Sequence, residues 1–192
     1  MKKNLIYTAV FKKQEYLDLT CLLLKSIHLF SNVRNSNTDI LIYTTSEFAN
    51  EICDRVKDYK LPIFFDIFNE TTITCIFQLC CFRLQIFNNN FIHNYDKILY
   101  IDTDILINSD ISKLFSLNID FDKIYAIEEG CIDHIFYGGN FFNFDEIDKT
   151  TTAFSSGVML FKNSPIVKEL FDNINDHIWH ILNTDQRKIL FY

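Results

Sequence analysis

The sequence predicts an α/β fold with a mostly parallel central sheet and helices on both faces. Three observations lead to this prediction. Apolar stretches of strand length alternate with longer stretches whose apolar positions recur at helical spacing. The stretch "KILYI" at residues 97–101 is almost wholly apolar, as expected of a parallel strand that is covered on both faces. The 192 residues, 48% of them hydrophobic and 22% charged, are enough to bury one sizeable core.

The first half of the chain contains two strand–helix units, a third strand and a third helix. "LIYTAV" is an apolar strand, and "EYLDLTCLLLKSIHLF" follows it with helical periodicity. "DILIYTT" and "SEFANEICDRVKDY" repeat the unit, with Ser46 as the expected helix N-cap. "PIFFDIF" is a strand, and "ITCIFQLCCFRLQIF" is a helix that three asparagines end. The predicted strands are residues 5–10, 39–45 and 62–68, and the predicted helices are residues 15–30, 46–59 and 73–87.

The second half continues the pattern after a strand at residues 97–102. "IYAIEEG" and "SGVMLFKN", residues 124–130 and 156–163, are predicted strands separated by a loop-rich stretch. Ser164 and Pro165 form an N-cap and first-turn pair, which opens a helix over residues 166–182. No linker, repeat or low-complexity tract interrupts the sequence. We therefore expect a single domain over residues 1–192.

Asp102 and Asp104 stand where the strand at residues 97–102 ends. In open α/β sheets, ligands bind beyond the carboxyl ends of the strands. Residues two apart on an extended chain point to the same side, so both carboxylates could reach one ion while Thr103 faces away. Mg²⁺ or Mn²⁺ suits such an all-oxygen pair, and it would help an acidic protein to hold a polyanion. The alternative is that Asp102 caps a turn and Asp104 is simply solvated.

Charge and hydropathy exclude several classes of protein. The net charge of −7 and the lack of a basic stripe argue against nucleic-acid binding. No apolar stretch reaches the roughly 18 residues of a spanning helix, and the apolar core of "MKKNLIYTAVF" is too short for a signal peptide. We therefore expect a cytoplasmic protein.

The abundance of Phe, Ile, Asn and Lys is typical of an AT-rich genome, such as that of a virus or a parasite.

The stretch "FRLQIFNNNFIHNYDKILYIDTDILINSDISKLF" resembles the centre of the family 8 glycosyltransferases, which include glycogenin and bacterial lipopolysaccharide galactosyltransferases. The shared order is an Arg-Leu helix, a strand ending in DxD, a short apolar strand, and a small helix ending in "LF". "YTAVFKKQEYLDLTCLLLKSI", "FSSGVMLFKNS" and "NTDQRKIL" resemble three further parts of the family. The resemblance implies a GT-A fold, which is a Rossmann-like fold of nucleotide-sugar transferases.

The resemblance further implies a metal-dependent, retaining transfer of a hexose from a UDP-sugar, with Mn²⁺ or Mg²⁺ as cofactor. By analogy with the family, Asp102 contacts ribose or metal, Asp104 ligates the metal, and Arg83 approaches the donor phosphate or sugar. Asp185 would hold sugar hydroxyls, and Gln186 would lie near the reacting carbon as a positioning group. The remaining donor-binding residues implied by the resemblance are Thr8, Ala9, Tyr16, Thr103, Ser156 and Gly157.

Single residues also allow simpler explanations. Tyr16 could stack on uracil or be a half-buried packing residue. Arg83, on an otherwise apolar helix, needs either a buried carboxylate or a phosphate as its partner.

The sequence departs from the family in two places. Ser155 stands where the family usually has an Asn, which leaves the identity of the sugar open. The family's third metal ligand is a His in an "HxxGxxKPW" stretch, and nothing in these 192 residues matches it. The metal could be held by the aspartates, diphosphate and water, or by a His from elsewhere, or the chain could be an inactive relative.

Two other classes remain as alternatives. One is a non-catalytic module that binds a nucleotide sugar or a partner protein. The other is a phosphatase of the haloacid dehalogenase type, which also places DxD after an apolar strand, although usually at the start of its domain. For the transferase, the expected partners are a nucleotide-sugar donor and a glycan, protein or lipid acceptor of unknown identity. Assembly into a homo-oligomer is left open.

Overall fold

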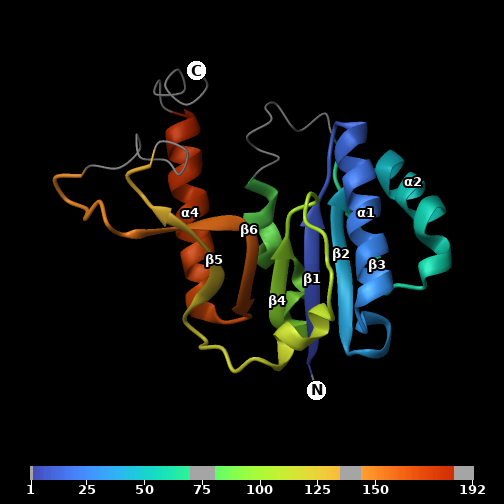
Figure 1. Ribbon diagram of the computed structural model, residues 1–192. Helices are drawn as coiled ribbons and strands as arrows, with labels where there is room; N and C mark the ends of the chain where they lie inside the picture. Colours follow the sequence, from blue (N-terminus) through green and yellow to red (C-terminus); the bar gives the residue numbers. More distant parts are fainter. Residues whose placement is uncertain (1, 70–80, 135–143, 184–192) are drawn as a thin grey trace.

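A computed structural model of the protein describes residues 2–69, 81–134 and 144–183. It contains one six-stranded sheet with the strand order β3-β2-β1-β4-β6-β5 (Figure 1). The first four of these strands are parallel to one another, whereas β6 runs antiparallel to both β4 and β5. The predicted α/β class and mostly parallel sheet are confirmed. The prediction of a single domain over residues 1–192 stays a prediction.

The elements follow the predicted order closely. The strands are β1 (Lys3–Ala9), β2 (Thr38–Thr44), β3 (Ile63–Ile67), β4 (Tyr95–Ile101), β5 (Ile124–Cys131) and β6 (Thr152–Lys162). The α-helices are α1 (Gln14–Phe30), α2 (Ser46–Val56) and α4 (Pro165–Asn183), and the longer 3-10 helices are η4 (Cys81–Asn88), η5 (Asn90–Asn94) and η6 (Ile111–Ser116). None of the described helices is long and apolar enough to cross a membrane.

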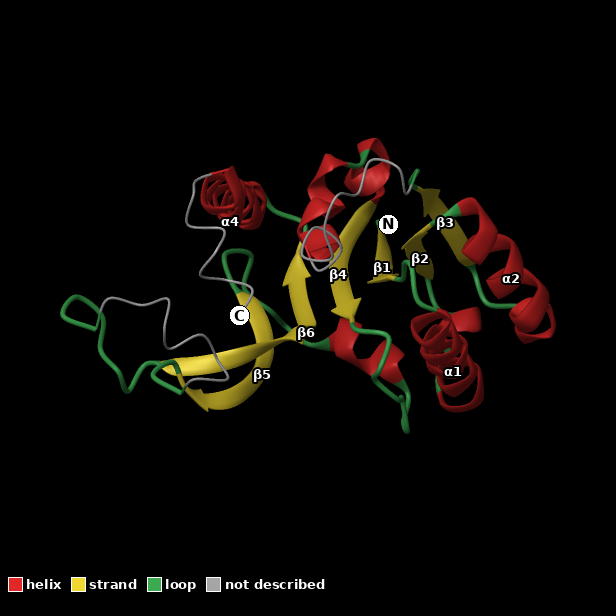
Figure 2. Ribbon diagram, turned by 90° about the horizontal axis from the view of Figure 1, so that it is seen from above, coloured by secondary structure: helices red, strands yellow, loops and turns green. Residues whose placement is uncertain are grey.

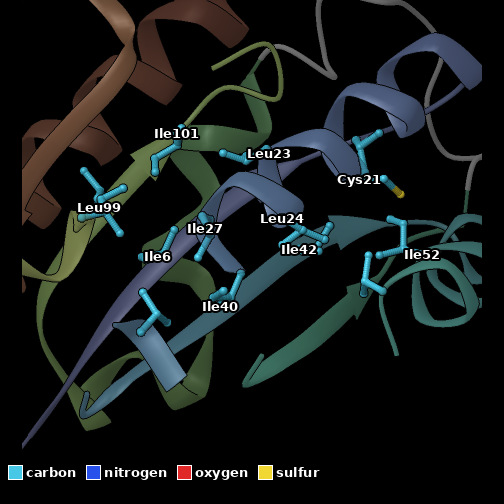
Figure 3. Close-up of a cluster of buried hydrophobic side chains, with 14 of the residues drawn as sticks. Ile6, Cys21, Leu23, Leu24, Ile27, Ile40, Ile42, Ile52, Leu99 and Ile101 are labelled. Atoms are coloured by element: carbon cyan, nitrogen blue, oxygen red, sulfur yellow. The ribbon is translucent and has the colours of Figure 1, made fainter. Parts of the chain in front are cut away.

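Two layers of helix cover the sheet, because successive side chains of its central strands point to opposite faces. Ile6 of β1 belongs to a core cluster shared with α1 and α2, whereas Leu5 and Tyr7 belong to a second cluster shared with η4 and α4. Figure 2 shows α1 and α2 on one side of the sheet and α4 on the other. The close-up in Figure 3 shows the first cluster, where Leu24 and Ile27 of α1 pack against the strands.

Two helix starts test the capping predictions. Ser164 is confirmed as the N-cap of α4, since its Oγ accepts a hydrogen bond from the Val167 amide at 3.2 Å. The prediction for α2 was wrong by one residue. Thr45 is its N-cap and accepts from the Phe48 amide, because Thr45 has the extended backbone that a cap requires. Ser46 is instead the first helical residue.

Three other local predictions need correction. The α-helix expected at residues 73–87 is a 3-10 helix where the structure describes it, in η4, because tertiary packing overrides the sequence pattern there. The short apolar strand expected after DxD is absent from residues 105–107, where the Ile107 amide bonds Ser26 Oγ of α1 at 3.0 Å instead of a neighbouring strand. Strand β6 begins at Thr152, four residues before the predicted start, because it pairs with β5 there.

Candidate active site

A cavity of about 310 Å³ opens at the carboxyl ends of β1 and β4. From β1 the chain passes through α1 to β2 on one side, whereas β4 is added on the other side. The connections therefore leave these two neighbouring strands in opposite directions, which is the arrangement that creates a binding crevice in open α/β sheets. The residues that line the cavity are Ala9, Val10, Phe11, Lys12, Lys13, Tyr16, Arg83, Tyr100, Asp102, Thr103 and Asp104.

Asp102 is the first residue after β4 and is fixed from three directions. Its Oδ1 accepts a hydrogen bond from the Tyr100 hydroxyl and lies 3.3 Å from Arg83 Nη2. Its backbone amide donates to the Gly157 carbonyl of β6 at 2.8 Å. The side chain of Asp102 is 32% exposed and that of Arg83 is 18% exposed, so this ion pair forms part of the cavity wall.

Arg83 reaches the cavity from η4. Its Nη1 donates to both the carbonyl oxygen and the Oγ of Ser156, at 2.9 and 2.8 Å. Its guanidinium carbon lies 4.9 Å from the centroid of the Tyr100 ring, within the range of a cation–π contact. Of the two partners expected for Arg83, the structure therefore provides the carboxylate, in Asp102, and leaves the guanidinium at the edge of the cavity.

Gly157 allows the close approach of β6 to Asp102. A Cβ atom built on Gly157 would lie 2.9 Å from Asp102 Oδ2, a separation too short for a real contact. Its amide donates to Ser155 Oγ at 3.2 Å, so Ser155 is turned toward its own strand. Asp102 thus keeps its position only because residue 157 has no side chain.

For the UDP site that the family resemblance implies, replacing Gly157 with alanine is expected to weaken UDP binding about tenfold while leaving a cooperative unfolding transition. The added methyl would push Asp102 off Tyr100 and Arg83, and overpacking of this kind costs about 1–3 kcal/mol. Titration calorimetry measures the affinity, and a thermal melt measures the fold. Unchanged affinity in the folded variant would show that the position of Asp102 does not matter for binding.

Asp104 and Thr103 do not continue the strand as predicted. Residues 103 and 104 form a turn, in which the Ile105 amide donates to the Asp102 carbonyl at 3.3 Å. The backbone at Asp104 is therefore not extended as predicted, yet both carboxylates line the same cavity. Thr103 is buried and also lines it, instead of facing away. Among the described residues, the exposed carboxylate of Asp104 has no hydrogen-bond or ion-pair partner, so it remains available to a ligand.

The loop between β1 and α1 forms the opposite wall. Ala9 lines the cavity, whereas the Thr8 side chain is buried away from it. Tyr16 is 43% exposed, and Lys13 Nζ lies over its ring, 5.8 Å from the ring centroid. Its partial exposure leaves room for a stacking role.

Lys12 and Lys13 also line the cavity, and the sequence analysis missed them. Lys12 has a φ of 64°, a left-handed conformation that is uncommon outside glycine and often marks a ligand site. Two adjacent lysines between a strand and a helix, in a chain of net charge −7, were the available signal. They add positive charge beside the two aspartates.

The remaining site predictions stand as follows. Ser156 and Gly157 of β6 lie beside the Arg83–Asp102 pair, and their role in donor binding stays a prediction. Asp185 and Gln186 lie outside the described residues.

Within the part of the chain that the structure describes, no group of three or more His, Cys, Asp or Glu side chains could hold a metal. Asp102 and Asp104 do fit Mg²⁺ or Mn²⁺ in chemistry, because both offer carboxylate oxygens to one cavity and such ions accept diphosphate and water as further ligands.

Several solved structures share this architecture. The bifunctional glycosyltransferase WbbM, in its apo form, matches with a TM-score of 0.61 and 15% identity over 88% of this chain and 33% of its own. Mouse xyloside xylosyltransferase 1 matches with a TM-score of 0.58 and 13% identity, over 88% and 72% of the two chains. Core-mannan synthase A from Aspergillus fumigatus, in its Mn/GDP form, matches with a TM-score of 0.57 and 10% identity, over 92% of this chain and 65% of its own. The chain thus spans a third of WbbM.

These likenesses, together with the strand order and the position of the cavity, define a GT-A glycosyltransferase fold. Among curated proteins, none matches the sequence. The family model of glycosyl transferase family 8 matches residues 9–191, almost the whole chain. The chain belongs to this family of glycosyltransferases. The sequence-based recognition is confirmed.

Proposed function

We propose that the protein transfers a hexose from a UDP-sugar to an acceptor, with retention at the anomeric carbon and with a divalent metal ion. The observation that carries the proposal is the joint placement of Asp102, Asp104 and Arg83 in one cavity at the carboxyl ends of β1 and β4. Two carboxylates suit a hard cation, and an arginine suits phosphate oxygens, so together they suit a metal-bound diphosphate.

Asp102 and Asp104 would hold the metal through carboxylate oxygens. When bound, Mn²⁺ or Mg²⁺ would neutralise charge on the departing diphosphate. The Mn/GDP form of core-mannan synthase A, a protein of the same fold, supports a metal together with a nucleotide. Arg83, already held by Ser156 at the cavity edge, would complement the same negative charge from the side of β6.

The nucleoside and the sugar would occupy opposite ends of the cavity. Tyr16 would stack on uracil, and the backbone near Thr8 and Ala9 would line the uridine. Ser156 and Gly157 would lie near the donor sugar. Asp185 would bind sugar hydroxyls, and Gln186 would position the reacting carbon, both as proposed from the family resemblance.

The experiment that tests this function is an assay of UDP release from UDP-hexoses, with Mn²⁺ and with a chelator. Glycosyltransferases without an acceptor can pass the sugar to water, so the assay needs no knowledge of the acceptor. We expect metal-dependent UDP release, with the α or β configuration of the donor preserved in the product seen by NMR. Metal-independent release would contradict the proposed metal role, and inversion would contradict retention.

Membership of family 8 disfavours the phosphatase alternative that the sequence left open. A haloacid dehalogenase-type phosphatase usually has its DxD after the first strand of the domain, whereas Asp102 and Asp104 follow β4. A non-catalytic module would bind UDP without releasing it from UDP-hexoses, so the same assay tests that alternative.

A further inference from the structure

Two buried tyrosines lie under the Arg83–Asp102 ion pair. Tyr7 of β1 and Tyr100 of β4 are neighbours across the parallel strands, and their ring centroids are 5.0 Å apart. Both side chains are almost wholly buried, in the core cluster that faces η4 and α4. A buried tyrosine needs a hydrogen-bond partner for its hydroxyl, so the partners of these two hydroxyls indicate what the rings support.

Each hydroxyl contacts a different member of the ion pair. The Tyr100 hydroxyl donates to Asp102 Oδ1, and the Tyr7 hydroxyl donates to the Arg83 carbonyl oxygen at 2.6 Å. Burial raises the pKa of Tyr7 well above its ordinary value, and the neighbouring Tyr43 and Tyr100 raise it further. The Tyr7 hydroxyl therefore stays protonated and remains a donor.

Tyr100 contacts both charged groups at once. Its hydroxyl donates a hydrogen bond to the carboxylate of Asp102, while the centroid of its ring lies 4.9 Å from the guanidinium carbon of Arg83.

Strand β6 contacts Arg83 at an irregularity in its pairing with β5. Ala126 of β5 pairs with Met159, and the next residue, Ile127, pairs with Ser155. Residues 156–158 of β6 therefore have no paired residue on β5 and form a bulge. At this bulge, Arg83 Nη1 donates a hydrogen bond to Ser156 Oγ.

We propose that Tyr100 is a positioning residue for donor binding: it fixes both Asp102 and Arg83 in their binding geometry before a ligand arrives, while Tyr7 holds the backbone of Arg83. This inference rests on the proposed function only in that the ion pair serves a nucleotide sugar. The physical consequence is preorganisation. Groups that are already held in place lose less conformational freedom when the ligand binds.

Three variants separate the contributions. Tyr100→Phe removes only the hydroxyl and keeps the ring under Arg83. Tyr100→Leu removes the ring as well. Tyr95→Phe is a matched control, because Tyr95 is a buried tyrosine at the other end of β4 whose hydroxyl also donates to a carboxylate, Asp39 Oδ2, at 2.9 Å.

The first readout uses the protein without any ligand. Phenylglyoxal modifies accessible arginines, and mass spectrometry of the Arg83 peptide gives the rate. We expect Tyr100→Leu to accelerate modification of Arg83 about fivefold through loss of the cation–π contact, and Tyr95→Phe to leave the rate unchanged. A wild-type rate in Tyr100→Leu would overturn the inference, whether or not the protein binds UDP.

The second readout is the affinity for UDP with Mn²⁺, measured by calorimetry. We expect Tyr100→Phe to weaken it about tenfold, as loss of a hydrogen bond to a charged group would, while a cooperative thermal unfolding transition shows that the variant is folded. Wild-type affinity in Tyr100→Phe would overturn the role of the hydroxyl. Failure of the wild-type protein itself to bind UDP would instead count against the proposed donor, and the Arg83 rate would still decide the inference.

Discussion

Replacing Arg83 with alanine is expected to lower the rate of UDP release from a UDP-hexose about 10²- to 10³-fold, the usual cost of removing one group that stabilises charge in a transition state. The variant loses the cation beside the departing diphosphate. It also leaves Asp102 without its ion-pair partner at 3.3 Å and Ser156 without its donor. The rate of UDP release under saturating Mn²⁺ measures the effect.

Two further variants make this result specific. Arg83→Lys keeps a positive charge but loses the planar fork that reaches Asp102 and Ser156 together, so it should recover only a small part of the rate. Arg55→Ala is the matched control, because Arg55 also forms ion pairs, with Asp18 and Glu51, and does not line the cavity. Equal losses in the Arg83 and Arg55 variants would mean that the effect comes from general destabilisation.

The second large effect is expected for Asp104→Asn. An amide is a much poorer ligand for Mn²⁺ or Mg²⁺ than a carboxylate, and the change would remove one of the two carboxylates proposed to hold the ion. Apparent metal affinity in the presence of UDP should fall by at least about 100-fold, since changes to residues that merely orient metal ligands already cost about 10- to 100-fold. Titration of Mn²⁺ against UDP release measures it.

Stability should not change in this variant, because Asp104 is exposed and has no partner among the described residues. Asp54→Asn, at an exposed position on α2, is the control for loss of one surface carboxylate. If Asp104→Asn and Asp54→Asn show the same metal dependence, Asp104 is not a ligand.

Much of the fold could be predicted because its strands are short, apolar and separated by clear helical periodicity. β4 is an example, since "KILYI" is almost wholly apolar, as a strand covered on both faces requires, and β4 is largely buried. Asp102 and Asp104 could be located for the same reason, because polar residues directly after such a strand have to lie at the edge of the sheet. Arg83 was also predicted as a site residue, and the structure places it in the same cavity.

The contacts that fix these residues could not be predicted. Arg83 bonds Ser156, a residue 73 positions away, through a bulge in β6 that no local pattern indicates. The sequence pattern indicates only that Tyr7 and Tyr100 are core residues. The register of β1 against β4 brings their side chains together. The adjacent Lys12 and Lys13 could have been noticed in the sequence, but the left-handed backbone of Lys12 has no sequence signature.

We propose that Asp102 and Asp104 bind a metal ion that in turn holds a nucleoside diphosphate. Titration calorimetry of UDP into the protein, once with Mn²⁺ and once with a chelator, tests it most directly and requires neither the sugar nor the acceptor to be known. We expect UDP to bind with Mn²⁺ and not with the chelator. Equal binding in both conditions, or none in either, would contradict the assignment of these two aspartates to a metal-bound diphosphate.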